Sequence, residues 1–318
     1  MAKSGVIINL TAGRGNGKGA ALADALHNRN IANVKILNSF ADLHPALIEL
    51  SKSEIDMLFI SSGDGTIQAI TTALAETKLF AKIPKLCILS HGTTNLTAID
   101  LGFNKRSIAG QVNFIAASQP TTVIKRHTLK VLNPSDGAPR HGFSFGAGAS
   151  ARATRLTQTD FNDKGRKGQL AAFSVLLGAI FTSVFTRPDP QDKSRLNRPT
   201  LIHVEVDGKP LCSNEQLMIL ATTLEKQFFN ARPFWGGKNG PIRISAFAYP
   251  VFNLLRWLLP IMYGSENRKM PKGAVSLSGD SFTITCAEPY VMDGEFFDGP
   301  KTGPLRVEAG PVFEFITN

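Results

Sequence analysis

In the first 120 residues, short apolar runs alternate with segments rich in helix-forming residues. The predicted strands are residues 6–10, 34–37, 57–61 and 85–89, and the predicted helices are residues 20–29, 42–51, 67–76 and 95–101. Such alternation indicates a parallel sheet with helices on both faces. Ligands bind such sheets at the carboxyl ends of the strands, where the polar turns after Leu10, Ile60 and Leu89 are expected to lie.

Beyond residue 120 the pattern changes to strands separated by turn signals such as Asp136-Gly137, Asp207-Gly208 and Asn239-Gly240. The predicted strands are residues 121–132, 140–145, 200–206, 216–222, 242–246, 281–286 and 304–308. We therefore predict an α/β plus β fold. A Rossmann-like parallel α/β domain covers residues 1–120, and an antiparallel β-sandwich covers residues 121–318, with last strands that can return to the first domain.

Two apolar stretches interrupt the second half. Residues 170–185 carry no charge but are too short and too rich in Ser and Thr for a transmembrane helix, so a buried or cleft-lining helix is favoured. Residues 247–263 contain Pro250, Arg256 and Pro260, which also argue against a membrane span. The aromatic residues and leucines of this stretch fit an interfacial surface and a core segment equally well.

Composition narrows the class of protein. The chain has 318 residues, of which 43% are apolar and 19% charged, as in ordinary soluble proteins with two domains. Cys87, Cys212 and Cys286 are too far apart for a disulfide framework or a metal-ligand motif and indicate a reducing compartment. The first residues lack the apolar core of a signal peptide, so a cytoplasmic location is expected.

The net charge of +10 predicts acidic partners. The sequence has no zinc-finger spacing, aromatic RNA-binding signature or long basic block, so nucleic acid is disfavoured. Peripheral contact with an anionic membrane surface fits better. The sequence does not indicate the oligomeric state.

The tetrapeptide Gly63-Asp64-Gly65-Thr66 joins a predicted strand to a predicted helix. Glycines allow a tight turn and a close approach of phosphate to the backbone, and a helix N-terminus attracts anions. A carboxylate repels phosphate unless it holds a metal ion or accepts a proton during phosphoryl transfer. The alternative is that Asp64 merely caps its own helix. The two flanking glycines favour a nucleotide site.

Two other turns offer phosphate-binding groups. The first is glycine-rich and basic, but it matches neither the P-loop nor the dinucleotide-binding pattern, and an ordinary strand-to-helix loop is its alternative. It contains Gly13, Arg14, Gly15 and Asn16. The second, Gly92-Thr93-Thr94-Asn95, offers hydroxyls, an amide and a helix start, although Thr94 or Asn95 could be only an N-cap. His91, just before it, is interpreted as a loop histidine.

The acidic pair Asp293 and Glu295 flanks Gly294 in the β-rich half. On one strand, residues two apart point to the same face, so the two carboxylates could contact a ligand together. The alternative is a hairpin turn with two solvated acids.

These four segments, taken in order and spacing, resemble the diacylglycerol kinase catalytic-domain family of lipid kinases, which includes sphingosine and ceramide kinases. The resemblance covers nearly the whole chain and implies ATP and Mg²⁺ in a cleft between the two domains. It implies that Gly63, Gly65 and Thr66 bind phosphates and that Asn9, Gly13, Thr94 and Asn95 line the nucleotide site. By the same resemblance, Asp64 activates the lipid hydroxyl or organises Mg²⁺, and Glu295 and, less directly, Asp293 contribute near the metal.

The sequence departs from the family pattern at three places. Ser62 replaces a glycine, Ala69 replaces a glutamate and Lys238-Asn239-Gly240 replaces an Asp-Asp-Gly. These changes leave open how Mg²⁺ is held. The leading interpretation is an ATP-dependent kinase for diacylglycerol, ceramide or a sphingoid base. The alternatives are a kinase for a soluble nucleotide, similar to the NAD kinases, and a nucleotide or lipid sensor that has lost catalysis.

Overall fold

The chain folds into two compact units. A computed structural model describes residues 3–15, 17–31, 33–92, 96–103, 107–117, 122–164, 195–227, 230–265 and 268–317. The first unit is Met1–His127 with Pro311–Asn318, and the second is Thr128–Gly310. The chain passes between them within strands β5 (Thr122–Val131) and β15 (Leu305–Thr317). The end of the chain therefore belongs to the first unit, and the division lies a few residues beyond position 120.

The first unit is a parallel sheet with the strand order β2-β1-β3-β4, followed by the end of β15. Its strands are β1 (Ser4–Asn9), β2 (Asn33–Leu37), β3 (Met57–Ser62) and β4 (Lys85–Ser90). Its helices are η1 (Ala12–Arg14), α1 (Lys18–Asn28), η2 (Phe40–Asp42), α2 (Leu43–Lys52), α3 (Asp64–Glu76), α4 (Leu96–Leu101) and α5 (Ile108–Ala117).

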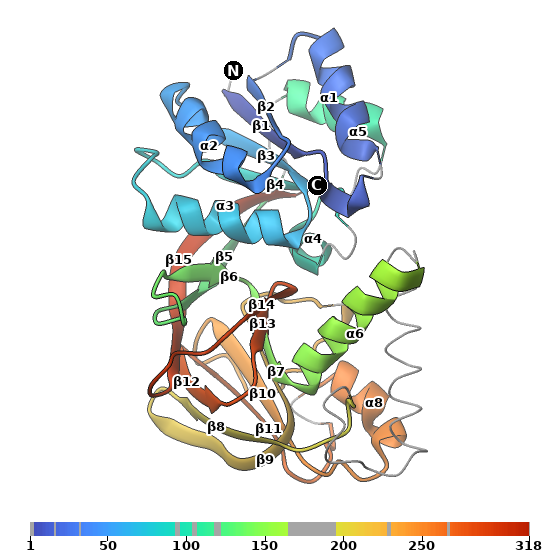
Figure 1. Cartoon of the computed structure of the whole chain (residues 1–318), viewed down its shortest axis with the longest axis vertical. Helices are drawn as coiled ribbons and strands as arrows, with labels where there is room; N and C mark the ends of the chain where they lie inside the picture. The colour runs from blue at the N-terminus through green and yellow to red at the C-terminus, as the bar shows by residue number, and fades with distance from the viewer. Residues whose placement is uncertain are drawn as a thin grey trace. The chain divides into compact units, whose positions relative to one another are not determined.

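Both faces of this sheet are buried, which explains why its strands are apolar throughout rather than alternating. Val6, Ile8 and Phe59 on one face pack with residues of α1 and α5 in a single apolar cluster. Ile7 and Leu58, which are also fully buried, point to the other face. Figure 1 shows α1 and α5 on one side of the sheet and α2 and α3 on the other. The predicted doubly covered parallel sheet is confirmed.

The second unit is built from antiparallel strands. These are β6 (Arg140–Gly142), β7 (Ser144–Gly148), β8 (Thr200–Val206), β9 (Lys209–Thr222), β10 (Ile242–Ala248), β11 (Ala274–Gly279), β12 (Ser281–Cys286), β13 (Tyr290–Met292) and β14 (Glu295–Phe297). Two helices, α6 (Ala149–Lys164) and α8 (Leu254–Met262), are described here.

Strand β9 joins the layers of this unit. Most of its length pairs with β8, and its end pairs with both β7 and β10. Its inward residues, such as Ile219 and Ala221, share one apolar core with residues of β5, β7, β8, β10, β12, β13 and β15. Antiparallel strands closing around one core form the predicted sandwich.

Several elements differ from the sequence-based expectation. Helices α5 and α6 and strands β11, β13 and β14 were not predicted, and residues 140–145 form parts of two strands that are interrupted at Phe143. Residues 247–263 hold the end of β10 and helix α8. The predicted helix at 170–185 lies outside the described residues. Among the described helices, none is long and apolar enough to cross a membrane.

Candidate functional site

Asp64 is the first residue of α3, directly after the carboxyl end of β3. Its side chain is only 6% exposed. Its Oδ1 accepts a hydrogen bond of 3.0 Å from the backbone N–H of Thr97, in the first turn of α4. The N-cap of α3 is Gly63, so Asp64 does not itself occupy the capping position. Its carboxylate connects the starts of two helices.

The glycine before Asp64 lies beside the turn that follows β4, and it has an ordinary backbone conformation. Gly63 is extended, with φ −99° and ψ 177°, which any residue can adopt. A Cβ at this position would lie 3.4 Å from the Cα of Gly92. The turns that follow β3 and β4 are thus in contact, and two glycines form their meeting point. Gly65 lies within α3 and not in the turn.

Asn9 connects the end of β1 to the start of α3. Its Oδ1 accepts hydrogen bonds from the Thr11 N–H at 2.9 Å and from the Thr11 hydroxyl at 2.7 Å. This fixes the amide orientation, and Nδ2 donates to the Thr66 Oγ1 at 2.9 Å. Three predicted site residues, Asn9, Asp64 and Thr66, therefore lie at one end of the first sheet.

The loop after β1 depends on left-handed glycines. Gly13, Gly15 and Gly17 have φ values of 59°, 65° and 77°. A Cβ on Gly15 or Gly17 would have no neighbour within 4 Å, so the backbone angle, rather than crowding, favours glycine there. Asn16, Thr93, Thr94 and Asn95 lie outside the described residues, and only the backbone of Arg14 is described.

Gly19, in the first turn of α1, has a role that the sequence did not reveal. A Cβ on Gly19 would lie 3.2 Å from Ile8 Cγ2 and 3.4 Å from the Asn9 carbonyl oxygen. The glycine lets α1 pack closely on β1 and so places the helix start beside Asn9. Its position in a glycine-rich loop was visible in the sequence, but the close packing was not.

A buried histidine also lies at this end of the sheet. His91 is 2% exposed, and its Nδ1 is 2.7 Å from the Ser61 Oγ. Burial lowers the pKa of His91 to about 4, and the nearby charge of Lys18 acts in the same direction, while a hydrogen bond to the side chain of Gln111 opposes them. The ring is therefore neutral at pH 7. His91 does lie in the turn after β4, as interpreted from the sequence, but it is buried rather than exposed to solvent.

Three more polar groups at this end are buried without a hydrogen-bond partner in the described structure: the Ser62 Oγ, Gln68 Nε2 and Thr97 Oγ1. Ser62 ends β3, Thr97 donates its N–H to Asp64, and Gln68 lies one helical turn after Asp64 on the same face of α3. Buried polar groups nearly always have partners, so unmatched ones beside a buried carboxylate indicate a polar ligand.

In the second unit, Asp293 and Gly294 form the two-residue turn of the β13–β14 hairpin, in which Met292 pairs with Glu295. Both turn residues have positive φ, 48° and 87°, as a tight hairpin of this length requires. Asp293 and Glu295 therefore do not lie on one strand, and the expectation of a shared face is wrong. The hairpin of the alternative is observed, but of its two acids only Glu295 is exposed to solvent, and Asp293 is buried.

The two acids of this hairpin have different surroundings. Asp293 is 3% exposed, and its Oδ1 accepts hydrogen bonds from the Ser144 N–H at 2.8 Å and the Ser144 hydroxyl at 2.9 Å. Its Oδ2 accepts the Phe143 N–H at 2.9 Å. Asp293 thereby fixes the break between β6 and β7. Glu295 is exposed, and Gln158 of α6 donates to the Gly294 carbonyl at 2.7 Å.

The described residues contain no group of three or more His, Cys, Asp or Glu side chains that could hold a metal ion. This agrees with the chemistry of Mg²⁺, which commonly keeps several waters and binds one or two protein carboxylates together with substrate phosphates. In the first unit, the buried carboxylate of Asp64 beside unmatched polar groups fits such a role.

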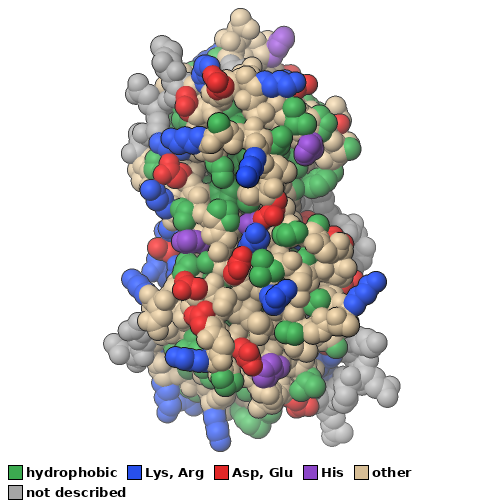
Figure 2. Space-filling view, turned by 90° about the vertical axis from the view of Figure 1, so that its left-hand side faces the viewer, with side chains coloured by type: hydrophobic (Ala, Val, Ile, Leu, Met, Phe, Trp, Pro, Cys, Tyr) green, Lys and Arg blue, Asp and Glu red, His purple; other side chains and the backbone are tan. Residues whose placement is uncertain are grey.

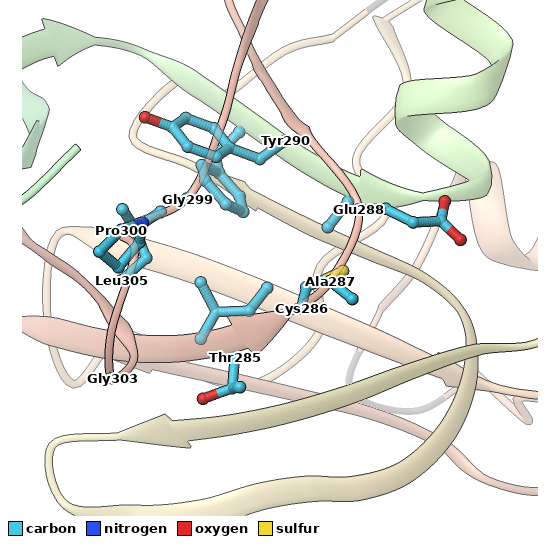
Figure 3. A pocket seen from close by; sticks show the side chains of 12 residues that line it. Thr285, Cys286, Ala287, Glu288, Tyr290, Gly299, Pro300, Gly303 and Leu305 are labelled. Atoms are coloured by element: carbon cyan, nitrogen blue, oxygen red, sulfur yellow. The ribbon is translucent and has the colours of Figure 1, made fainter. Parts of the chain in front are cut away.

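The second unit contains a cavity of about 210 Å³. Figure 3 shows Tyr290, Leu305 and Pro300 around it and the Glu288 carboxylate turned away from them. That carboxylate pairs instead with Arg152 at 3.0 Å and Arg198 at 2.7 Å. Figure 2 shows one face of the molecule, on which basic and acidic side chains are intermixed rather than gathered into one patch.

Part of the chain is similar to a known protein family. Residues 3–125 match the family profile of the diacylglycerol kinase catalytic domain. No curated protein sequence gives a significant match. A crystal structure of a putative diacylglycerol kinase from Bacillus anthracis str. Sterne shares 17% identity and a TM-score of 0.67, over 100% of this chain and 97% of that chain.

A second structure from the same organism, of a diacylglycerol kinase, has a TM-score of 0.66 at 17% identity, again over 100% of this chain and 97% of that chain. Yeast NADH kinase in complex with NADH has a TM-score of 0.49 at 12% identity, over 98% of this chain and 80% of that chain. At these identities the first two structures show a shared fold, which confirms the predicted fold class.

Proposed function

We propose that the protein is an ATP-dependent lipid kinase that transfers the γ-phosphoryl group of ATP to the primary hydroxyl of a membrane lipid. The match of residues 3–125 to the profile of the diacylglycerol kinase catalytic domain supports this proposal. The family is one of kinases, and ATP binding follows from it. The further part of the proposal is that the acceptor of the phosphoryl group is a lipid. Diacylglycerol, ceramide and a sphingoid base each carry the required hydroxyl.

One observation supports the proposal most strongly: Asp64 is buried at the start of α3, beside buried polar groups that have no hydrogen-bond partner in the described structure. An alcohol is a weak nucleophile at pH 7, and a carboxylate within hydrogen-bonding reach can accept its proton as phosphoryl transfer proceeds. The new bond joins the lipid oxygen to the γ-phosphorus, the bond from that phosphorus to the bridging oxygen breaks, and ADP leaves.

The phosphates are proposed to bind around this carboxylate. The N-terminus of α3 offers backbone N–H groups and a positive dipole end at Gly65 and Thr66. The left-handed glycines of the loop after β1 leave open space in which a phosphate can approach the backbone. We assign Gly13, Arg14, Gly15, Asn16, Gly92, Thr93, Thr94 and Asn95 to the nucleotide site on the basis of these turns.

Mg²⁺, when bound with the nucleotide, would neutralise phosphate charge, and Asp64 is the residue that we propose to hold it. In the second unit, Glu295 is the proposed additional carboxylate, since it is exposed. Asp293 holds the backbone of Phe143 and Ser144. We therefore propose that Asp293 acts by positioning the hairpin that carries Glu295.

The test uses purified full-length protein with labelled ATP and Mg²⁺. The acceptors are diacylglycerol, ceramide and sphingosine in mixed micelles, with NAD in a parallel reaction. We expect label on a lipid with the natural sequence and almost none with Asp64→Asn. Label on NAD would replace the proposal with a soluble-nucleotide kinase, and ATP binding without transfer to any acceptor would indicate a sensor.

A further inference from the structure

Helix α8 and the residues at its two ends expose large apolar side chains. Phe252 is 77% exposed, Leu255 42%, Leu259 64% and Tyr263 39%. Leu255 and Leu259 lie one turn apart on the same side of the helix, while Phe252 precedes its N-cap and Tyr263 is its C-cap. Large apolar side chains gathered on one face indicate a binding surface, unlike single exposed hydrophobes.

The opposite side of α8 anchors the helix to the second unit. Trp257 and Ile261, four residues apart, pack in one apolar cluster with Phe247 of β10 and Leu217 of β9. The helix therefore has two apolar sides, one used in the core and one directed outward. This explains why the sequence of residues 247–263 fitted a core segment and an interfacial surface equally well.

The charged residues in the sequence around α8 are almost all positive. Between residues 248 and 279 the sequence has four basic residues and one acidic residue, Glu266. The four, Arg256, Arg268, Lys269 and Lys272, are exposed. The guanidinium of Arg268 donates to the Tyr263 carbonyl at 2.8 Å, so the basic segment is tied to the end of the apolar helix.

We propose that α8 is the docking surface of this protein for an anionic lipid bilayer. The α8 surface, by which we mean Phe252, Leu255, Leu259 and Tyr263 with the four cations, combines the two attractions that bind a peripheral helix. Apolar side chains enter the boundary between headgroups and acyl chains, and basic side chains contact anionic headgroups. With nine residues, α8 is too short to span a bilayer, so it lies in the interface.

A second copy of the chain fits this surface less well than a bilayer does. A symmetric contact would bring the same basic segments close together, and like charges facing each other oppose association. An acidic membrane instead offers a complementary charge over the whole surface. The proposal rests on the proposed function only in expecting a substrate that resides in the bilayer.

The first test measures binding of the full-length protein to sedimented vesicles of phosphatidylcholine alone and of phosphatidylcholine mixed with phosphatidylglycerol. We expect stronger binding to the anionic vesicles. The double variant Phe252→Ser with Leu259→Ser should lower the partition coefficient at least about tenfold, because two exposed apolar side chains no longer enter the interface. Lys269→Gln with Lys272→Gln should reduce the preference for anionic vesicles by roughly an order of magnitude.

The matched control is Leu201→Ser on β8, where the natural leucine is 73% exposed. It should change vesicle binding by less than about twofold, because it lies outside the α8 surface. Equal losses in the control and the double variant, or no loss in either, would overturn the proposal. So would a shift from dimer to monomer caused by the double variant in lipid-free sedimentation, which would assign the surface to a second copy.

A parallel assay separates this proposal from the proposed function. With a short-chain diacylglycerol dispersed as monomers, the double variant should retain the natural rate of label transfer, while its rate on vesicles should fall with binding. Vesicle binding that depends on α8 without transfer to any lipid would remove the kinase assignment and leave the docking surface. If the protein phosphorylates a lipid but the double variant binds vesicles as well as the natural sequence does, the kinase assignment stands and the docking surface is removed.

Discussion

Asp64 in the first unit and Asp293 in the second are both buried, and a glycine follows each of them, but their carboxylates have different surroundings. Asp293 lies in a left-handed hairpin turn and accepts hydrogen bonds from the Phe143 and Ser144 amides and the Ser144 hydroxyl. Asp64 starts a helix, accepts the Thr97 N–H and lies where other buried polar groups have no partner in the described structure. The same Asp-Gly pair thus stabilises a turn in one unit and marks a candidate ligand site in the other.

The largest effect on activity is expected when the charge of Asp64 is removed. We expect Asp64→Asn to lower the rate of phosphoryl transfer by about 10²- to 10⁴-fold, the range attributed to a positioned proton acceptor. Stability should change little, because the asparagine oxygen can still accept the Thr97 N–H. Initial rates and urea unfolding of the same preparation measure both quantities. A stable variant with full activity would show that Asp64 is structural, like Asp293.

Asp293→Ala should have the reverse effects, lowering stability while leaving ATP binding intact. It leaves the Phe143 and Ser144 amides buried without an acceptor, so we expect the free energy of unfolding to fall by about 3 kcal/mol. Urea denaturation checks this value. The variant that remains folded should still bind ATP, which equilibrium dialysis measures. Unchanged stability would mean that the hydrogen bonds from the β6–β7 break contribute nothing, and the contrast between the two aspartates would disappear.

The predictable parts of the fold are those in which the pattern of apolar residues in the sequence matches the burial of the element in the folded protein. The strands of the first unit are buried on both faces, so unbroken apolar runs such as residues 57–61 identified them. Helix α6 was missed because its sequence, Ala149–Lys164, has no apolar stripe and is rich in Thr and polar residues. Strands β13 and β14 have three residues each, too short for an alternating pattern to emerge.

The same distinction holds for the site. The Asp64 turn was found because its groups are neighbours in sequence between a strand and a helix. The contacts of Asn9 with Thr66 and of His91 with Ser61 join residues far apart in the chain, and residue type alone does not reveal such pairs. The hairpin at Asp293 could be proposed but not chosen, because Asp-Gly after the apolar residues Val291 and Met292 suits both a strand and a turn.

The pH dependence of stability also distinguishes the two regions, because buried His91 lies at the same end of the first sheet as Asp64. Its pKa in the folded protein is about 4, below the ordinary histidine value of 6.5. Between these values the unfolded chain binds a proton that the folded protein does not, so stability falls as the pH drops through this interval. We expect a loss of at most about 3 kcal/mol from this group.

Urea unfolding at pH 7 and pH 4.5 measures the loss. His91→Gln should remove most of it, because glutamine does not titrate. If the variant loses as much stability as the natural protein over this interval, other groups are responsible for the pH dependence, and His91 is not held neutral by its surroundings.

The smallest expected effect compares two exposed glycine turns, one from each unit. Gly15 and Gly137 have φ values of 65° and 77°. A Cβ on either would have no neighbour within 4 Å. Gly15→Ala and Gly137→Ala should therefore each lower the free energy of unfolding by a similar amount, about 1 kcal/mol, since alanine is strained in this conformation.

Only Gly15→Ala should weaken ATP binding, raising the Kd by roughly fivefold, which corresponds to about 1 kcal/mol. Calorimetric titration with ATP and thermal unfolding of both variants test this. Equal ATP affinities would show that the loop after β1 does not contact the nucleotide, whereas a selective loss would assign phosphate binding to the first unit independently of Asp64.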